Sequence, residues 1–269
     1  MITNVLIPTD FSENSWNAIQ YATSFFKNRK CTFYLLHVNE INGFPYNGKT
    51  FHPESRNQLQ SLIHKIEDTF KNPHHTFFAL TATGSIVDSI RIEVENKNID
   101  LIVMGTKGTS GIKKIAVGSN TTDVISKVKC NTLVIPEEAR YSEIKNLALP
   151  TDYNIFYGAK ILETISDIME MFDAQIHIIH LAKKNELIVG DQVQNKELLQ
   201  DYFMEDNHRF MSLTNRNLDK AIQECVEKHD IKLIAMVAKN IHFFQQIFFS
   251  SNSTHTRYQK EIPFLVLHE

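Results

Sequence analysis

The sequence predicts an α/β protein with two tandem open parallel sheets of five strands, each flanked by helices. Short apolar runs typical of strands alternate with segments of helical periodicity, which is the pattern of parallel βαβ units rather than of hairpins. The chain also repeats its own strand motifs in one order. Its 269 residues are enough for two ordinary domains, each with a buried core.

The first half of the chain supplies one complete set of elements. Ser12 and Ser85 each precede a helical pattern and are the expected N-caps, because a serine hydroxyl accepts a hydrogen bond from an unpaired amide of the first turn. Asp88, three residues after Ser85, strengthens the second of these signals. Strands are expected at 4–8, 32–38, 76–80, 99–104 and 132–135, and helices at 14–26, 54–71, 85–96 and 121–127.

Five short motifs of the first half return in the second half. Residues 6–10 and 34–38 return at 148–152 and 177–181, which are offsets of 142 and 143. Three later motifs return at an offset of 132, and these are 102–104, 119–120 and 132–135. Because the order is kept throughout, we expect two copies of one domain, at 1–138 and 145–269, joined by a short charged linker.

Composition excludes several classes of protein. The formal net charge is -3 and no basic stripe is visible, which argues against a nucleic-acid-binding protein. No apolar run approaches the roughly 18 residues that a membrane span needs. Three widely spaced cysteines without a CxxC motif indicate a reducing compartment, and the N-terminus has no pattern of a signal peptide. We therefore expect a cytoplasmic protein.

A glycine-rich loop carries the main functional signal. The predicted strand at 99–104 runs into Gly105-Thr106-Lys107-Gly108, and Gly118-Ser119-Asn120 follow after nine residues, just before a predicted helix. Glycine lets backbone amides approach an anion closely, and the N-terminus of a helix attracts negative charge. The loop therefore indicates a site for a phosphate-bearing ligand, although it matches neither a Walker A nor a dinucleotide motif. A glycine-rich turn needed only for backbone geometry is the alternative.

These motifs resemble those of the ATP-binding universal stress proteins. The resemblance rests on 8–12 (Pro-Thr-Asp-Phe-Ser), on His37-Val38, and on the spacing Gly105-x2-Gly108-x9-Gly118-Ser119, and it covers nearly the whole chain as two successive domains. It implies an adenine-nucleotide-hydrolase-like sheet in each domain and ATP as the ligand, with or without a divalent cation on its phosphates. It places Asp10 and Val38 at the adenosine, with Pro8 and Thr9 in the wall of the nucleotide site. The residues that it implies around the ribose and phosphates are Met104, Gly105, Gly108, Gly118, Ser119 and Asn120. Asn120 departs from the family pattern, and a role as helix cap is the alternative.

The second copy has lost the glycines. Val237, Asn240 and Ser250 stand at the positions of Gly105, Gly108 and Gly118, and the bulky, aromatic segment 241–249 lies between them. Such side chains obstruct the close approach that a phosphate needs, so we expect that this copy binds no ATP. The aromatic residues would then fill the pocket or form an interface; an ordinary core role is the alternative.

The sequence offers no catalytic set. No Ser-His-Asp or Cys-His arrangement can be assembled, and the equivalent His37 and His180 are expected to be packed, hydrogen-bonded histidines. We therefore expect a nucleotide-binding protein of stress response or signalling, with one site per chain, slow or incidental hydrolysis at most, and a homodimer of tandem chains as a candidate assembly. The alternative is an interaction module that binds no nucleotide. A hydrolase of the related group would instead carry a pyrophosphate loop after its first strand.

Overall fold

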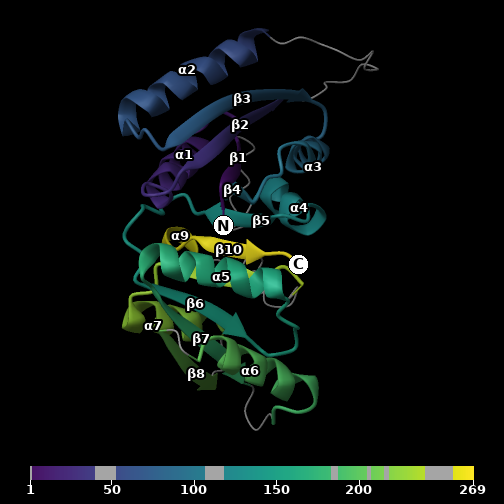
Figure 1. The fold of residues 1–269 in the computed structure, drawn as a ribbon, viewed down its shortest axis with the longest axis vertical. Helices are drawn as coiled ribbons and strands as arrows, with labels where there is room; N and C mark the ends of the chain where they lie inside the picture. Colours follow the sequence, from purple (N-terminus) through teal and green to yellow (C-terminus); the bar gives the residue numbers. More distant parts are fainter. Residues whose placement is uncertain are drawn as a thin grey trace. The chain divides into compact units, whose positions relative to one another are not determined.

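Two sets of parallel strands, one in each half of the chain, form the framework of this protein (Figure 1). The computed structural model describes residues 2–39, 53–106, 118–182, 187–204, 207–214, 218–239 and 257–269. These residues divide into two compact units, an N-terminal unit up to Glu137 and a C-terminal unit from Glu138 onward.

The N-terminal unit contains a five-stranded parallel sheet in the order β3-β2-β1-β4-β5. Register is continuous at its centre, where β1 pairs with β2 from Asn4–Thr32 to Pro8–Leu36. Its elements are β1 (Asn4–Pro8), α1 (Glu13–Phe25), β2 (Cys31–Asn39), α2 (Pro53–Phe70), β3 (His75–Thr83), α3 (Ile86–Asn96), β4 (Leu101–Gly105), α4 (Ser119–Lys127) and β5 (Asn131–Ile135).

The C-terminal unit has the same topology, with the parallel order β10-β9-β6-β7-β8. The predicted fold class, with two tandem parallel five-stranded sheets, is confirmed. The elements are β6 (Asn146–Thr151), α5 (Ala159–Phe172), β7 (Gln175–Ala182), α6 (Asp191–Tyr202), β8 (His208–Thr214), α7 (Leu218–His229), β9 (Leu233–Val237), α9 (Arg257–Glu261) and β10 (Phe264–Leu267).

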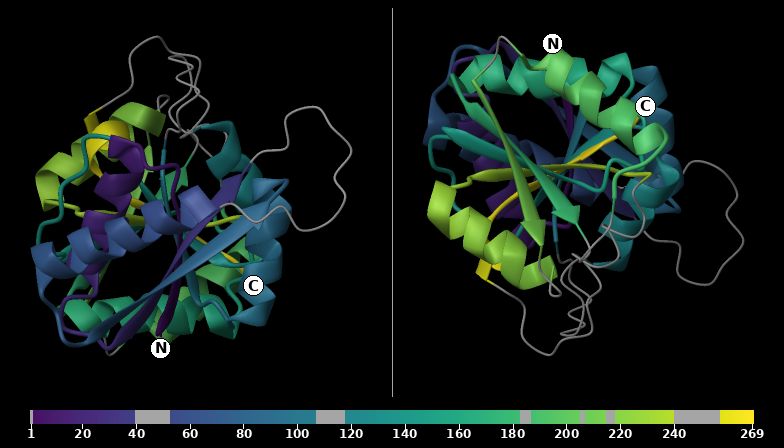
Figure 2. Two further views of the ribbon diagram at one scale, coloured as in Figure 1. Left: turned by 90° about the horizontal axis from the view of Figure 1, so that it is seen from above. Right: turned by 90° about the horizontal axis from the view of Figure 1, so that it is seen from below.

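Helices cover both faces of each sheet. In the N-terminal unit α3 and α4 pack together on one face, and α1 and α2 lie on the other, as right-handed crossovers require when the strand order reverses (Figures 1 and 2). In the C-terminal unit α5 and α6 lie across the sheet from α7 (Figure 2, right). Fully buried side chains of β1, α3, β4 and α4, among them Leu6, Ile90, Ile102 and Val124, form a core between sheet and helices.

Helices α1 and α3 begin where the predicted serine N-caps place them. The Ser12 hydroxyl accepts a hydrogen bond from Ser15 N at 3.2 Å, and the Ser85 hydroxyl accepts one from Asp88 N at 3.4 Å, which confirms both predicted caps. Helix α4 differs, because its N-cap is Gly118 and no side chain caps it. The alternative role of Asn120 as a helix cap is therefore wrong; Asn120 lies inside the first turn.

His177, in the middle of β7, introduces a titratable group into the C-terminal core. Its side chain is 1% exposed, and its Nε2 lies 3.0 Å from Asn146 Oδ1. The imidazole of His229 at the end of α7 packs 4.9 Å away, and Arg209 lies opposite on β8. Burial, together with the positive charges of His229 and Arg209, lowers the pKa of His177 to about 4.

We predict that His177 makes the protein acid-labile. The unfolded chain takes up a proton on this histidine near pH 6.5, whereas the folded chain does so only near pH 4, so its contribution to stability is complete above pH 6.5 and lost as the pH falls toward 4. Urea unfolding from pH 7.5 to 4.5 should show the wild-type free energy of unfolding falling by about 1 to 2 kcal/mol more than that of His177→Gln. The exposed control His64→Gln should follow the wild type; equal slopes for wild type and His177→Gln would contradict the prediction.

Candidate functional site

The carboxyl ends of β1, β2 and β4 lie at one edge of the N-terminal sheet, and Thr9 joins the first two. Its amide donates a hydrogen bond to Leu36 O at 2.8 Å, and its carbonyl oxygen lies 2.8 Å from His37 Nδ1. The His37 ring packs on Phe11 at 4.6 Å between ring centroids. Phe11 has a φ of 62°, in the left-handed region, and its amide donates to the Thr9 hydroxyl at 3.1 Å. His37 is thus a packed, hydrogen-bonded histidine, as expected.

Asp10 organises the turn that leads from this edge into α1. Its Oδ1 accepts hydrogen bonds from Ser12 N at 3.1 Å and from Ser12 Oγ at 2.5 Å. The register that pairs Pro8 with Leu36 brings Asp10 and Val38 to neighbouring strand ends, and both are half-buried. The two residues expected at the adenosine therefore share one edge of the sheet, although Asp10 also has a structural task there.

Gly105, at the end of β4, is a glycine because of its neighbour on α1. A Cβ placed on Gly105 would overlap the Asn14 side chain, with Asn14 Cγ at 2.8 Å, and would lie 3.1 Å from Asn14 O. The carbonyl oxygen of Gly105 accepts a hydrogen bond from the Thr121 hydroxyl at 2.8 Å, which ties β4 to α4. The bare backbone of Gly105, expected to serve a phosphate, is thus already required by packing.

Gly118 brings the start of α4 back to β4. Its amide donates a hydrogen bond to Thr106 O, and its φ of -62° is open to any residue. The amide of Gly118 is therefore engaged within the protein, and its backbone conformation does not require glycine. The first turn instead presents the amides of Ser119, Asn120 and Thr121, which precede the first bond of the helix, from Thr122 N to Gly118 O at 3.1 Å.

The remaining predicted residues divide by exposure. Pro8, Thr9 and Met104 are buried and could form only a wall, whereas Ser119 and Asn120 are exposed at the start of α4. Gly108 lies outside the described residues.

The equivalent strand edge of the C-terminal unit is filled by larger side chains. Tyr153 has the same left-handed backbone as Phe11, with a φ of 58°, stacks on His180 at 4.8 Å and is 2% exposed. Burial raises its pKa to about 12. Helix α6 holds this turn through Asn195 Nδ2, which donates to Tyr153 O at 2.9 Å, and Gln192 Nε2, which donates to Asp152 O at 2.8 Å.

The hydroxyl pairs beneath the two turns show the same change of size. In the N-terminal unit Thr9 Oγ1 lies 3.0 Å from Ser15 Oγ, and in the C-terminal unit Thr151 Oγ1 lies 2.5 Å from the hydroxyl of the buried Tyr157. Val237, which replaces Gly105, is also buried. Asn240, Ser250 and the aromatic segment 241–249 lie outside the described residues.

Sequence reasoning missed three residues that shape the N-terminal edge: Asn14, Thr106 and Thr121. Asn14 contacts Gly105 from the distant helix α1, whereas Thr106 and Thr121 connect the end of β4 with the start of α4, so no local motif identifies these residues. Among the described residues, no group of three or more potential metal-binding side chains comes together, and no described helix is long and apolar enough to cross a membrane.

We predict that Gly105→Ala destabilises the protein by about 1 to 3 kcal/mol, because overpacking at a rigid contact has costs of this size. In the double variant Gly105→Ala with Asn14→Ala, most of this loss should be recovered, since the clashing atoms are mainly in the Asn14 side chain. The measurement is chemical denaturation of the four proteins of the cycle. Gly158→Ala is the matched control, since its added Cβ would meet only Glu269 Cγ at 4.0 Å; simple additivity of the two changes would contradict the prediction.

Comparison with known proteins gives the chain its family. The model of the universal stress protein family matches residues 1–136. A universal stress protein of Methanocaldococcus jannaschii is 28% identical over 140 residues, which are 49% of this chain and 80% of the relative. A second universal stress protein of that organism is 27% identical over 154 residues, which are 50% of this chain and 95% of the relative. The structure of a universal stress protein from Archaeoglobus fulgidus matches with a TM-score of 0.69 and 19% identity over 98% of both chains, which shows a shared fold. This chain belongs to the universal stress protein family.

Proposed function

We propose that the N-terminal unit binds an adenine nucleotide, with ATP as the first candidate, at the carboxyl ends of β1, β2 and β4. The observation that carries the proposal is the uncapped N-terminus of α4. Helices α1 and α3 begin under serine hydroxyls, whereas α4 begins at Gly118 with no side-chain cap. The amides of its first turn and the helix dipole favour an anion at this position.

The strand ends beside this helix suit the rest of a nucleotide. Asp10 and Val38 supply a carboxylate and an apolar side chain on neighbouring strand ends, and the Thr9–His37 hydrogen bond holds that part of the edge in place. Ligands of open parallel sheets bind outside the carboxyl ends of the strands. A divalent cation would accompany the phosphates from solution, bound chiefly by their oxygens.

The C-terminal unit is proposed to bind no nucleotide. Tyr153 and Tyr157 fill the positions that Phe11 and Ser15 occupy in the N-terminal unit, and Asn195 and Gln192 of α6 hold the turn closed. Nucleotide occupancy of one unit would bias which conformation the whole chain adopts and which partners it binds. Such a bias fits a cytoplasmic signalling role better than catalysis of ATP hydrolysis.

An interaction module that binds no nucleotide is the second candidate function. It is favoured by large apolar side chains on the C-terminal unit, with Phe156 64%, Leu187 79% and Met204 66% exposed. A homodimer of tandem chains is one form of this candidate. Calorimetric titration with ATP separates the two functions, because only the first predicts nucleotide binding at the α4 terminus.

We predict that Gly118→Val weakens ATP binding at least tenfold in isothermal titration calorimetry, or about 1.4 kcal/mol, because a branched side chain would lie beside the first-turn amides. Gly158→Val is a matched control. Gly158 is also an N-cap without a side-chain cap, and its φ and ψ of -64° and 159° nearly equal the -62° and 157° of Gly118. Both variants should lose similar helix stability, but the control should keep wild-type affinity. Wild-type affinity in folded Gly118→Val would refute the site.

We further predict one nucleotide per chain. Calorimetric titration of the wild type should saturate at one equivalent, because Tyr153 and α6 close the second strand edge. Tyr153→Ala should leave this stoichiometry unchanged, since Val237 and Tyr157 remain. Two equivalents in the wild type would contradict the assignment of a single site.

A further inference from the structure

The C-terminal unit contains a cavity of about 260 Å³ that belongs to neither strand edge discussed so far. It lies between α7 and α9, beside Asp230–Lys232 before β9 and Ile262 before β10, and thus at the amino ends of these strands. We propose that this cavity binds a small organic monocarboxylate with an apolar body, which Arg257 and Lys232 recognise through its carboxylate.

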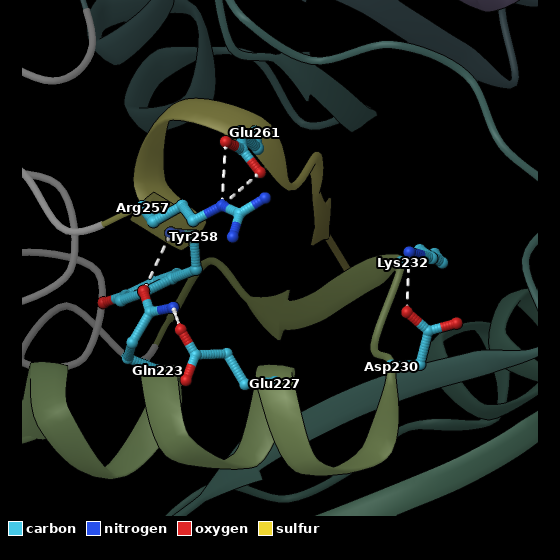
Figure 3. A network of polar contacts seen from close by, with 7 residues as sticks. All are labelled: Gln223, Glu227, Asp230, Lys232, Arg257, Tyr258 and Glu261. Atoms are coloured by element: carbon cyan, nitrogen blue, oxygen red, sulfur yellow. Dashed lines mark hydrogen bonds and ion pairs between the residues drawn. The ribbon is translucent and has the colours of Figure 1, made fainter.

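The walls of the cavity are held together by hydrogen bonds between α7 and α9 (Figure 3). Tyr258 N donates to Gln223 Oε1 at 3.0 Å, and Gln223 Nε2 donates to Glu227 Oε1 at 2.6 Å. The Tyr258 hydroxyl donates to Asp219 Oδ1 at 2.9 Å. The cavity is therefore a preformed space between two linked helices.

The positively charged groups of the cavity have more hydrogen-bond donors than their partners use. Arg257 Nε donates to both carboxylate oxygens of Glu261 at 2.9 Å, and among the described residues no acceptor bonds its two terminal nitrogens. Lys232 Nζ uses one donor on Asp230 Oδ1, at 2.7 Å. In Figure 3 one terminal nitrogen of Arg257 points away from Glu261, and the other points toward the side on which Lys232 lies.

A carboxylate satisfies this donor excess. The terminal edge of a guanidinium binds a carboxylate through two parallel hydrogen bonds, and a lysine ammonium adds a further donor. Glu261 and Asp230 balance the charges of Arg257 and Lys232, and among the residues that the structure describes Glu227 accepts only from the neutral Gln223, so the lining keeps one net negative charge. This remaining negative charge favours a monoanion over a doubly charged phosphate.

The apolar part of the lining and the volume limit the rest of the ligand. Val226, Ile231 and Tyr258 are each 8% exposed or less and provide an apolar surface beside the charged groups. At roughly 30 Å³ for each water-sized group, the cavity holds about nine non-hydrogen atoms. That is the size of benzoate, which joins a carboxylate to an apolar ring.

This site is peculiar to the second copy of the domain. At the offset of 132, Arg257 and Lys232 correspond to Ile125 and Asp100. Ile125 is buried in the N-terminal core, and Asp100 accepts hydrogen bonds from the amides of Thr3 and Asn4. The donor pair is therefore no remnant of the shared fold.

The test is a titration of the ¹⁵N-labelled full chain with benzoate, followed by backbone amide NMR. Saturable shifts of the Ile231, Lys232 and Tyr258 amides in the low-millimolar range are expected. The uncharged isostere benzamide should cause much smaller shifts at equal concentration. Arg257→Gln and Lys232→Gln should each weaken benzoate binding at least tenfold, whereas Lys239→Gln, which alters a lysine paired with Glu269 in the same unit, should not change it.

Three results would overturn the proposal. These are the absence of saturable shifts at these amides, equal shifts with benzoate and benzamide, and undiminished benzoate binding in folded Arg257→Gln and Lys232→Gln. Phenyl phosphate forms a further arm: tighter binding of phenyl phosphate than of benzoate at the same amides would overturn the assignment of a monocarboxylate in favour of a phosphate monoester. Chemical denaturation of each variant establishes that it is folded.

Discussion

The architecture of both units depends on one constraint, the sharp turn that follows the first strand. A non-glycine residue has to adopt a left-handed conformation there, which is unfavourable for a bulky side chain. In each unit the same three contacts offset this cost. The threonine hydroxyl accepts the amide of the strained residue, the aromatic ring packs on a histidine from the neighbouring strand, and that strand lies in register with the first. The turn then sets where the first helix begins, and so how closely Asn14 approaches Gly105.

The two units show how one framework can support different surfaces. The backbone of the turn is nearly the same, with φ of 62° at Phe11 and 58° at Tyr153. The side chains around it differ in size, since a serine in one unit is replaced by a buried tyrosine in the other. At the opposite edge of the C-terminal sheet, helix α9 contributes an arginine that has no counterpart in the first copy. Function can therefore diverge at either end of the strands while the core stays the same.

The sequence predicted most of the fold because its signals were local. Apolar runs and serine caps each depend on neighbouring residues, and the internal repeat consists of such local runs met twice, so the strands and caps were found within a few positions of their place. Strand ends were less accurate: β3 extends to Thr83, although the pattern predicted an end at residue 80, because pairing with β2 continues to Asn39. Tertiary pairing decides such boundaries, and periodicity does not contain that information.

The candidate site was predicted less well, for a different physical reason. The glycine pattern indicated the strand edge at which the site is proposed, but it could not tell why each glycine is there. Gly105 makes room for a side chain of α1, and Gly118 engages Thr106 with an ordinary backbone conformation. Both depend on contacts between different elements of the fold. A glycine motif shows where a side chain is absent, whereas the contacts of the folded chain show which group occupies that space.

The closure of the C-terminal strand edge has a consequence for the history of the chain. Restoring an open edge there would require smaller residues at Tyr153, Tyr157 and Val237, together with release of the amide side chains of α6. Each of these changes alone would leave a cavity or an unsatisfied buried polar group, and so would lower stability before any binding returned. Single substitutions toward an open edge would therefore each cost stability, so the difference between the two units is maintained by the requirements of folding.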